Sequence, residues 1–339
     1  MLDTLRLLLN RKTSGNAMLD TLLAAHDRKL QAVPDHVTAP PGAPVRKTFT
    51  STIPQDQTFF SKLTPAQRLT TAPGMLRLIA QVRRSAAYYQ HPLRNPKTVA
   101  GQDLFDQVDA TAREHGATAI RYVTLTNDCI LGNAGVPYRN AVIYTVRMDK
   151  QALDTAPSYA CFREVERGYL RLALIGNRIT ELLRAQGFAA YPGTAMGGLS
   201  DYTRIGELAG LGSIGYHGCL ITPGDGALLR LNIVYTSIDN LPQRPAEPTD
   251  WIRDFCSRCG RCVRECPARA IHPTPRLLDD GRVECIDSTA CLDYFTANFG
   301  CGICIDTCPL SQKPLEAIAR RFKGNPSAPS FKVRSTSTP

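Results

Sequence analysis

Cysteines in this sequence follow a spacing that binds iron–sulfur clusters. One run reads Cys256-Ser-Arg-Cys259-Gly-Arg-Cys262-Val-Arg-Glu-Cys266-Pro267, and a later one reads Cys301-Gly-Ile-Cys304-Ile-Asp-Thr-Cys308-Pro309. Closely spaced thiolates reach different corners of one [4Fe–4S] cubane, while the cysteine before each proline ligates the other cluster. The two runs therefore predict two [4Fe–4S] clusters and a protein that moves electrons.

This exchange of ligands divides the cysteines between the clusters. The first cluster receives Cys256, Cys259, Cys262 and Cys308, and the second receives Cys266, Cys301 and Cys304. The second set is one ligand short. Cys291 is the preferred fourth ligand, and Cys285 is the alternative close by. Zinc also binds pairs of Cys-x-x-Cys, but three evenly spaced cysteines with a Cys-Pro step fit zinc poorly.

Composition limits the class of protein. The 339 residues are 43% hydrophobic, and no uninterrupted apolar stretch is long enough to span a membrane. No secretion signal is recognisable near the N-terminus, so we expect a cytoplasmic protein without a membrane partner. The four remaining cysteines are expected to be reduced and idle: Cys129, Cys161, Cys219 and Cys285. The net charge of +10 is spread thinly, so we do not expect nucleic acid as a partner.

Hydrophobic periodicity predicts an α+β fold. Helices are expected from Thr64-Pro65, from near Gly74, over 102–115 and over 162–186, and strands over 119–125, 141–148 and 228–236. On the 102–115 helix the apolar stripe is Leu104, Phe105, Val108 and Ala112. On the last strand, Leu229, Leu231, Ile233 and Tyr235 face one way, and Arg230, Asn232 and Val234 face the other.

Shifts in composition divide the chain into four parts. Residues 1–97 form a helical and proline-rich arm, in which Met1-Leu-Asp-Thr-Leu5 recurs as Met18-Leu-Asp-Thr-Leu22. Residues 98–249 form the α+β core, and the proline-rich stretch 242–248 links it to a ferredoxin-like module over 250–322. Residues 323–339 are rich in Gly, Pro, Ser and Thr, which predicts a disordered tail.

Several segments before and within the cysteine runs resemble the reductive dehalogenases. They are Gly135-Val-Pro-Tyr-Arg-Asn-Ala-Val-Ile-Tyr-Thr-Val, Leu183-Arg-Ala-Gln-Gly-Phe-Ala-Ala-Tyr-Pro192, and Ala209-Gly-Leu-Gly-Ser-Ile-Gly-Tyr-His-Gly-Cys-Leu-Ile-Thr-Pro223 followed by Gly226 and Arg230. Cys291-Leu-Asp-Tyr-Phe, ahead of the Gly300-Cys-Gly-Ile-Cys run, is similar to their second cluster motif and supports Cys291 as the missing ligand. The segments occur in the family's order over roughly residues 117–315.

The resemblance implies a nitroreductase-like core that binds cobalamin base-off, with no protein ligand below the cobalt. Backbone groups of a glycine-rich segment would hold this cofactor, because a glycine without Cβ permits close approach. The residues expected to contact it are Gly210, Leu211, Gly212, Gly215, His217 and Gly218. Tight turns are the alternative explanation for these glycines.

The same resemblance implies a tyrosine proton donor held beside a basic residue. Counting along the matching segments places the tyrosine at Tyr169 and the basic residue at Arg230. A fixed guanidinium favours the phenolate form, which makes the phenol a better acid. Packing in the core is the alternative for Tyr169, and a solvated strand face is the alternative for Arg230.

The chain departs from the family in two places. It is short, and the loop Gly193-Thr-Ala-Met-Gly-Gly-Leu-Ser200 lacks the asparagine expected near the substrate. The related epoxyqueuosine reductases carry an acidic residue and Ser-Ala-Pro where this chain has Ala195-Met-Gly-Gly198. The cysteine spacing and the resemblance together imply a cobalamin-dependent iron–sulfur reductase of a small organic substrate, with reduced ferredoxin or flavodoxin as electron donor. A tRNA epoxyqueuosine reductase-like enzyme and a non-catalytic electron-transfer or corrinoid-binding protein remain the alternatives.

Overall fold

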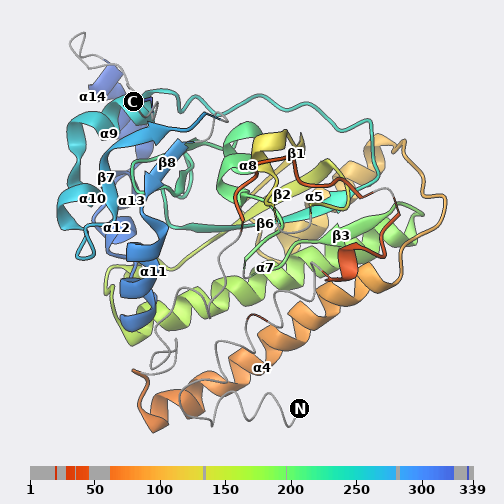
Figure 1. Ribbon diagram of the computed structural model, residues 1–339, viewed down its shortest axis with the longest axis horizontal. Coiled ribbons are helices and arrows are strands. Elements are labelled where there is room, and N and C mark those ends of the chain that lie inside the picture. The colour runs from red at the N-terminus through yellow and green to blue at the C-terminus, as the bar shows by residue number, and fades with distance from the viewer. Residues whose placement is uncertain are drawn as a thin grey trace.

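A computed structural model (Figure 1) describes residues 20, 28–34, 36–45, 62–132, 135–195, 197–279, 283–323 and 334–335. Most of the predicted N-terminal repeat and most of the predicted disordered tail lie outside these residues. Among the described helices, none combines the length and the apolar character needed to cross a bilayer.

A four-stranded antiparallel sheet forms the centre of the molecule. Its strand order is β1 (Ala119–Thr124), β2 (Asn140–Arg147), β6 (Leu229–Thr236) and β3 (Ala190–Pro192). Residues 141–146 of β2 are all buried, because helices and loops cover both faces of the sheet. The expectation of a mixed helix and sheet fold is thus confirmed. A nitroreductase-like core stays a prediction.

Long helices cover one face of the sheet. The helix α7 (Tyr159–Ala185) packs across β6, β3 and β2, and α4 (Pro65–Ala87) and α5 (Gln102–Glu114) pack on α7 in turn (Figure 1). The apolar stripe predicted for α5 is buried as expected. Residues 62–87 of the predicted N-terminal arm therefore contribute to the main core.

The prediction of two helices near Thr64 and Gly74 was wrong, because α4 runs unbroken through Pro73 and Gly74. Thr64 caps its start: the Gln67 backbone N–H donates to the Thr64 hydroxyl, and the Thr64 N–H donates to the Gln67 side chain. Gly74 lies where α4 touches α7, and a Cβ there would collide with the Glu166 carboxyl group. Packing on α7 thus overrides the local signal that Pro73 and Gly74 give.

The other face of the sheet carries smaller elements. These are α8 (Tyr202–Leu208) and a short hairpin of β4 (Ser213–Ile214) and β5 (Leu220–Ile221). Ile233 and Tyr235 pack on this side with Leu211 and Leu220, whereas Val234 packs on the α7 side. The predicted alternation along β6 is confirmed, so Arg230 and Asn232 point toward the long helices.

The C-terminal cysteine runs fold into a group of short elements at one end of the molecule (Figure 1). They are α9 (Trp251–Cys259), α10 (Arg261–Glu265), β7 (Ile271–Leu277), β8 (Val283–Ile286), α11 (Ser288–Ala297), α12 (Ile303–Asp306), α13 (Pro309–Gln312), α14 (Leu315–Lys323) and β9 (Arg334–Ser335). Trp251, Ile252 and Leu310 form their core, and Tyr216 from the β4–β5 turn is buried in the same cluster. That turn therefore joins the cysteine module to the sheet.

Candidate functional site

Helix α7 and strand β6 bring Tyr169 and Arg230 together. Arg230 Nη1 donates a hydrogen bond of 2.8 Å to the Tyr169 hydroxyl, and its guanidinium carbon lies 4.4 Å from the centre of the Tyr169 ring. Gly168 makes room for this contact, since a Cβ there would lie 3.3 Å from Arg230 Cδ. Arginine accepts no hydrogen bond, so the phenolic proton of Tyr169 is not used in this contact.

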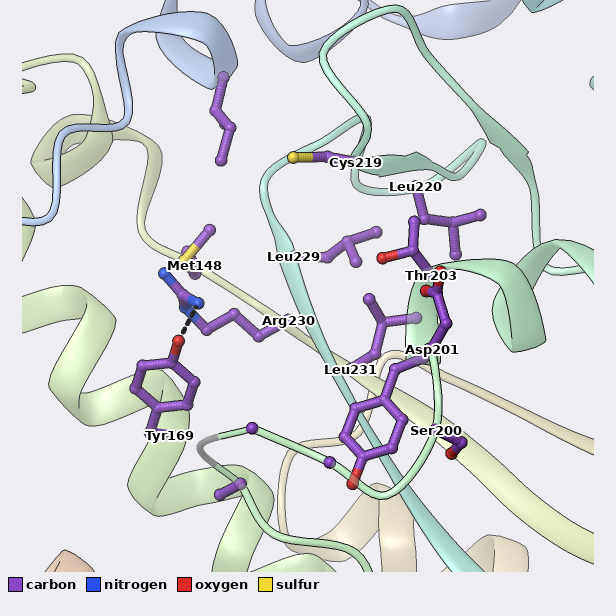
Figure 2. A pocket seen from close by; sticks show the side chains of 15 residues that line it. Met148, Tyr169, Ser200, Asp201, Thr203, Cys219, Leu220, Leu229, Arg230 and Leu231 are labelled. Atoms are coloured by element: carbon purple, nitrogen blue, oxygen red, sulfur yellow. Dashed lines mark hydrogen bonds between the residues drawn. The ribbon is translucent and has the colours of Figure 1, made fainter. Parts of the chain in front are cut away.

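The pair lines a pocket of about 360 Å³. Its apolar wall includes Met148, Leu229, Leu231 and Ile305, and its far end is formed by Ser200, Asp201 and Thr203 (Figure 2). Pockets of this size and mixed lining suit small organic molecules. Tyr169 and Arg230 supply the polar groups at one end, and neither lies on an open solvated strand or in a closed apolar core.

Sequence reasoning missed most of the other lining residues. The loop Gly193–Ser200, which lacks the asparagine expected near the substrate, contributes Gly197, Gly198 and Ser200 to the pocket lining. Cys219 was predicted to be idle, yet its side chain forms part of the wall (Figure 2). The spacing of Cys219 in the sequence does not indicate that it lies at the pocket. Its place in the pocket wall depends on how the β4–β5 turn packs on the cysteine module.

The first predicted cluster set surrounds a small cavity. Cys256, Cys259, Cys262 and Cys308 line it together with His217, Phe255, Gly260 and Pro309. Among the described residues, no three His, Cys, Asp or Glu side chains converge closely enough for a single ion, so these thiols border a space rather than meet at a point. Four thiols around a cavity fit the donor set of a cubane.

The second predicted set also gathers in one region. Burial raises the pKa of Cys291 to about 11, and its neighbours Cys219, Cys301 and Cys266 act in the same direction. Burial likewise raises the pKa of Cys285 to about 11, but that thiol interacts with His217, Arg253, Cys219 and Glu207. Cys291 thus lies among the other thiols of its set, and Cys285 lies beside the β4–β5 turn.

Two residues beside the second set of cysteines line the pocket. Ile305 follows Cys304 in the chain and lines the pocket, and the thiol of Cys219 interacts with that of Cys304. On the other side, the Cys161 thiol of α7 donates a 3.5 Å hydrogen bond to the Cys301 carbonyl. One and the same helix therefore carries Tyr169 and touches the cysteine run.

The glycine segment expected to hold a corrinoid makes close contacts with the chain itself. A Cβ on Gly212 would collide with the Ile221 carbonyl, and one on Gly210 would lie 2.8 Å from Ala246. A Cβ on Gly215 would lie 2.7 Å from Ile221, Gly218 adopts φ +76° opposite Cys285, and Leu211 is buried in the core. His217 lines the cluster cavity. These six residues do not line the pocket of Tyr169 and Arg230, so their role toward a corrinoid stays a prediction.

Part of the cysteine module matches a known family. Residues 249–272 match the 4Fe-4S binding domain. This stretch contains Cys256, Cys259, Cys262 and Cys266, so the iron–sulfur interpretation of the first cysteine run is confirmed.

Relatives of known function match between a third and a half of the chain. The tetrachloroethene reductive dehalogenase of Sulfurospirillum multivorans is 29% identical over 183 residues, 51% of this chain and 36% of that protein. The epoxyqueuosine reductase of Synechococcus sp. is 33% identical over 119 residues, 33% of this chain and 35% of that protein. The chain thus spans about a third of the length of these relatives.

Solved structures with the same fold are also reductive dehalogenases. A catabolic reductive dehalogenase in complex with 3-bromo-4-hydroxybenzoic acid gives a TM-score of 0.60 at 20% identity, covering 76% of this chain and 40% of that chain. A second solved structure, whose description refers to B12-dependent dehalogenation, gives a TM-score of 0.60 at 17% identity. The match covers 87% of this chain and 46% of that chain. The chain is therefore related to the superfamily of reductive dehalogenases and epoxyqueuosine reductases, and it is more similar to the reductive dehalogenases.

Proposed function

We propose that this protein is an iron–sulfur reductase that uses a corrinoid to reduce a small organic molecule, as a reductive dehalogenase does. One observation carries the proposal: the Tyr169–Arg230 pair lines a pocket whose wall includes Ile305, the neighbour of the predicted ligand Cys304. A proton donor would thus line a space whose wall includes the neighbour of a proposed cluster ligand. A proton and electrons are both needed when a carbon–halogen bond is replaced by a carbon–hydrogen bond.

The reaction needs two electrons and one proton, and it releases halide. Tyr169 supplies the proton, since its hydroxyl accepts from Arg230 and keeps its own O–H for a molecule in the pocket. Arg230 holds the phenol in place through this hydrogen bond and through its contact with the ring. Met148, Leu229 and Leu231 offer an apolar wall that excludes water from the carbon centre.

Two clusters would bring the electrons. The thiols around the cavity at Cys256 and Cys308 support the first, and the grouping of Cys291 with Cys266 and Cys301 supports the second. Bound corrinoid would supply the low-potential metal centre that reduces the substrate, since such chemistry belongs to the cofactor. The likeness to reductive dehalogenases supports its presence, and the glycine segment Ala209–Pro223 remains the proposed contact. A basic surface, with net charge +10, favours an acidic donor such as reduced ferredoxin or flavodoxin.

Anaerobic reconstitution tests the proposal. Protein loaded with iron, sulfide and cobalamin should retain the corrinoid through gel filtration. With reduced methyl viologen it should release bromide from 3-bromo-4-hydroxybenzoate or chloride from tetrachloroethene, and Tyr169→Phe should release far less. Retention of iron without corrinoid would instead favour a protein that only transfers electrons.

A further inference from the structure

His217 lies at the tip of the β4–β5 hairpin, between the sheet and the cysteine module. The turn closes through hydrogen bonds from Gly215 N–H to the Cys219 carbonyl at 3.1 Å and from Gly218 N–H to the Gly215 carbonyl at 2.9 Å. Gly215 also leaves room for the imidazole, since a Cβ there would lie 3.1 Å from His217 Cε1. The hairpin therefore holds the ring in one position.

One nitrogen of this ring has a partner that determines its protonation. The Cys219 backbone N–H donates to His217 Nδ1 at 3.0 Å. A backbone amide can only donate, so Nδ1 acts as acceptor and the ring proton resides on Nε2. The first nitrogen is thus occupied, and the second carries an N–H group that needs an acceptor.

That second nitrogen makes no hydrogen bond of normal geometry among the described residues, although the thiol of Cys308, a predicted ligand of the first cluster, lies close enough to interact with the ring. His217 is only 3% exposed, and Nε2 is completely buried. The ring lines the cavity that Cys256, Cys259, Cys262 and Cys308 surround. A buried N–H without an acceptor is destabilising, so such groups generally have a partner in the working protein.

We propose that His217 Nε2–H donates a hydrogen bond to a sulfur of the first cluster and thereby raises its reduction potential. This inference rests on the proposed presence of two clusters. Reduction adds negative charge to the cluster sulfurs, and a donor binds the more negative acceptor more strongly. Hydrogen bonds to the sulfurs are among the factors that set cluster potentials. His217 is a positioning and tuning residue here, and it does not contact the substrate.

The test compares variants that keep or lose the donor. His217→Gln places an amide N–H near the former Nε2, whereas His217→Leu has no donor, and both lose the acceptor for Cys219 N–H. His272 serves as a control, because its Nε2 contacts Glu284 at 3.0 Å on β8. Each full-length protein is reconstituted anaerobically, its iron is counted, and its clusters are titrated by electron paramagnetic resonance against potential.

His217→Leu should lower the potential of one cluster and leave the other unchanged. We expect about a tenfold fall in the ratio of reduced to oxidised cluster at fixed potential, or ~59 mV for a one-electron couple. In His217→Gln the potential should fall by less than half of that amount. In His272→Leu the potentials of both clusters should equal those of the wild type. If His217→Leu loses iron, His217→Asn replaces it, since its shorter amide does not reach the place of Nε2.

Equal potentials in the donor and non-donor variants would overturn the inference, as would equal shifts of both clusters. These outcomes differ from a failure of the proposed function. Wild-type protein with far fewer than about eight irons per chain would contradict the two clusters themselves. Eight irons with unshifted potentials would contradict only the role of His217.

Discussion

The hydroxyl of Tyr169 on α7 accepts a 2.8 Å hydrogen bond from Nη1 of Arg230 on β6, although the two residues lie 61 positions apart. The guanidinium also lies over the tyrosine ring at 4.4 Å. This double contact fixes the phenol in direction and in distance, because the planar guanidinium can donate and stack at once. The pair is therefore held in place before any substrate binds.

Tyr169→Phe should abolish proton delivery while preserving the structure. Phenylalanine keeps the ring that Arg230 covers, so iron content and corrinoid retention should equal those of the wild type. Loss of a general acid costs roughly 10²–10⁴-fold in rate, and halide release under reduced methyl viologen measures it. Unchanged halide release by Tyr169→Phe would return Tyr169 to a packing role.

Arg230→Lys should also slow the reaction, by about 10-fold or more, since an ammonium group can neither stack on the ring nor hold the phenol through a planar fork. A matched control is Arg147→Lys at the end of the neighbouring strand β2, because the Arg147 side chain is 52% exposed and lies outside the pocket lining. Halide release of both variants at saturating substrate makes the comparison. Equal rates in the two variants would contradict the proposed role of Arg230.

Sequence patterns predicted those parts of the fold that local periodicity controls. Local sequence was enough to predict the helix over 102–115, the alternation along β6 and the iron–sulfur motif. Each of these features depends on residues that are close together in the chain. The continuity of α4 through Pro73 was missed, because the packing of Gly74 on Glu166 decides it. Tertiary contacts also decide the position of Cys219.

The candidate site was predictable only with the help of the resemblance. Tyr169 lies on an apolar stripe and Arg230 on an alternating strand, and neither pattern alone indicates that they meet. His217 belongs to the glycine segment, and its spacing from the cysteine runs does not indicate that it lines the cavity of the first cluster set. Such positions depend on how the hairpin packs on a module more than 30 residues further along the chain, and hydrophobic periodicity carries no such information.

Cys291→Ser should remove iron, and Cys285→Ser should leave it unchanged. Cys291 lies among Cys266 and Cys301, whereas Cys285 lies opposite Gly218. Two cubanes require about eight irons and eight sulfides per chain, and the Cys291 variant should approach about half of that. Iron and sulfide analysis after anaerobic reconstitution provides the count. Equal losses from both replacements would contradict the assignment of the fourth ligand.

RNA should bind only through its phosphates. The positive charge is distributed over many short stretches, and several arginines are already paired, such as Arg204 with Asp128 and Arg244 with Asp109. Association with tRNA should therefore collapse as salt rises, along a linear plot of log affinity against log salt. Filter binding between 50 and 300 mM salt would measure it. Salt-resistant binding of one tRNA species would favour the epoxyqueuosine reductase-like alternative.

Glu166 should make stability depend on pH. The Glu166 side chain is 4% exposed between α7 and α4. Among the described residues, its Oε1 has no hydrogen-bond partner and its Oε2 pairs with Arg163. Burial raises the pKa of Glu166 from 4.5 to about 7, and the nearby Arg163 and Arg167 only partly oppose this. The unfolded chain therefore releases this proton at lower pH than the folded chain does.

The free energy of unfolding should consequently fall as pH rises from about 4.5 to about 7, and stay lower above that range. Glu166→Gln removes this titration, so its stability relative to the wild type should improve by about 1 kcal/mol between pH 6 and pH 8. Glu164→Gln is the control: Glu164 accepts from Asp149 N–H at 3.0 Å and pairs with Arg171 at 2.7 Å, so its loss should destabilise. Anaerobic urea unfolding at both pH values measures these differences. A stability difference between Glu166→Gln and the wild type that is the same at both pH values would show that the carboxyl group is ionised throughout, with its charge balanced by Arg163 despite the burial.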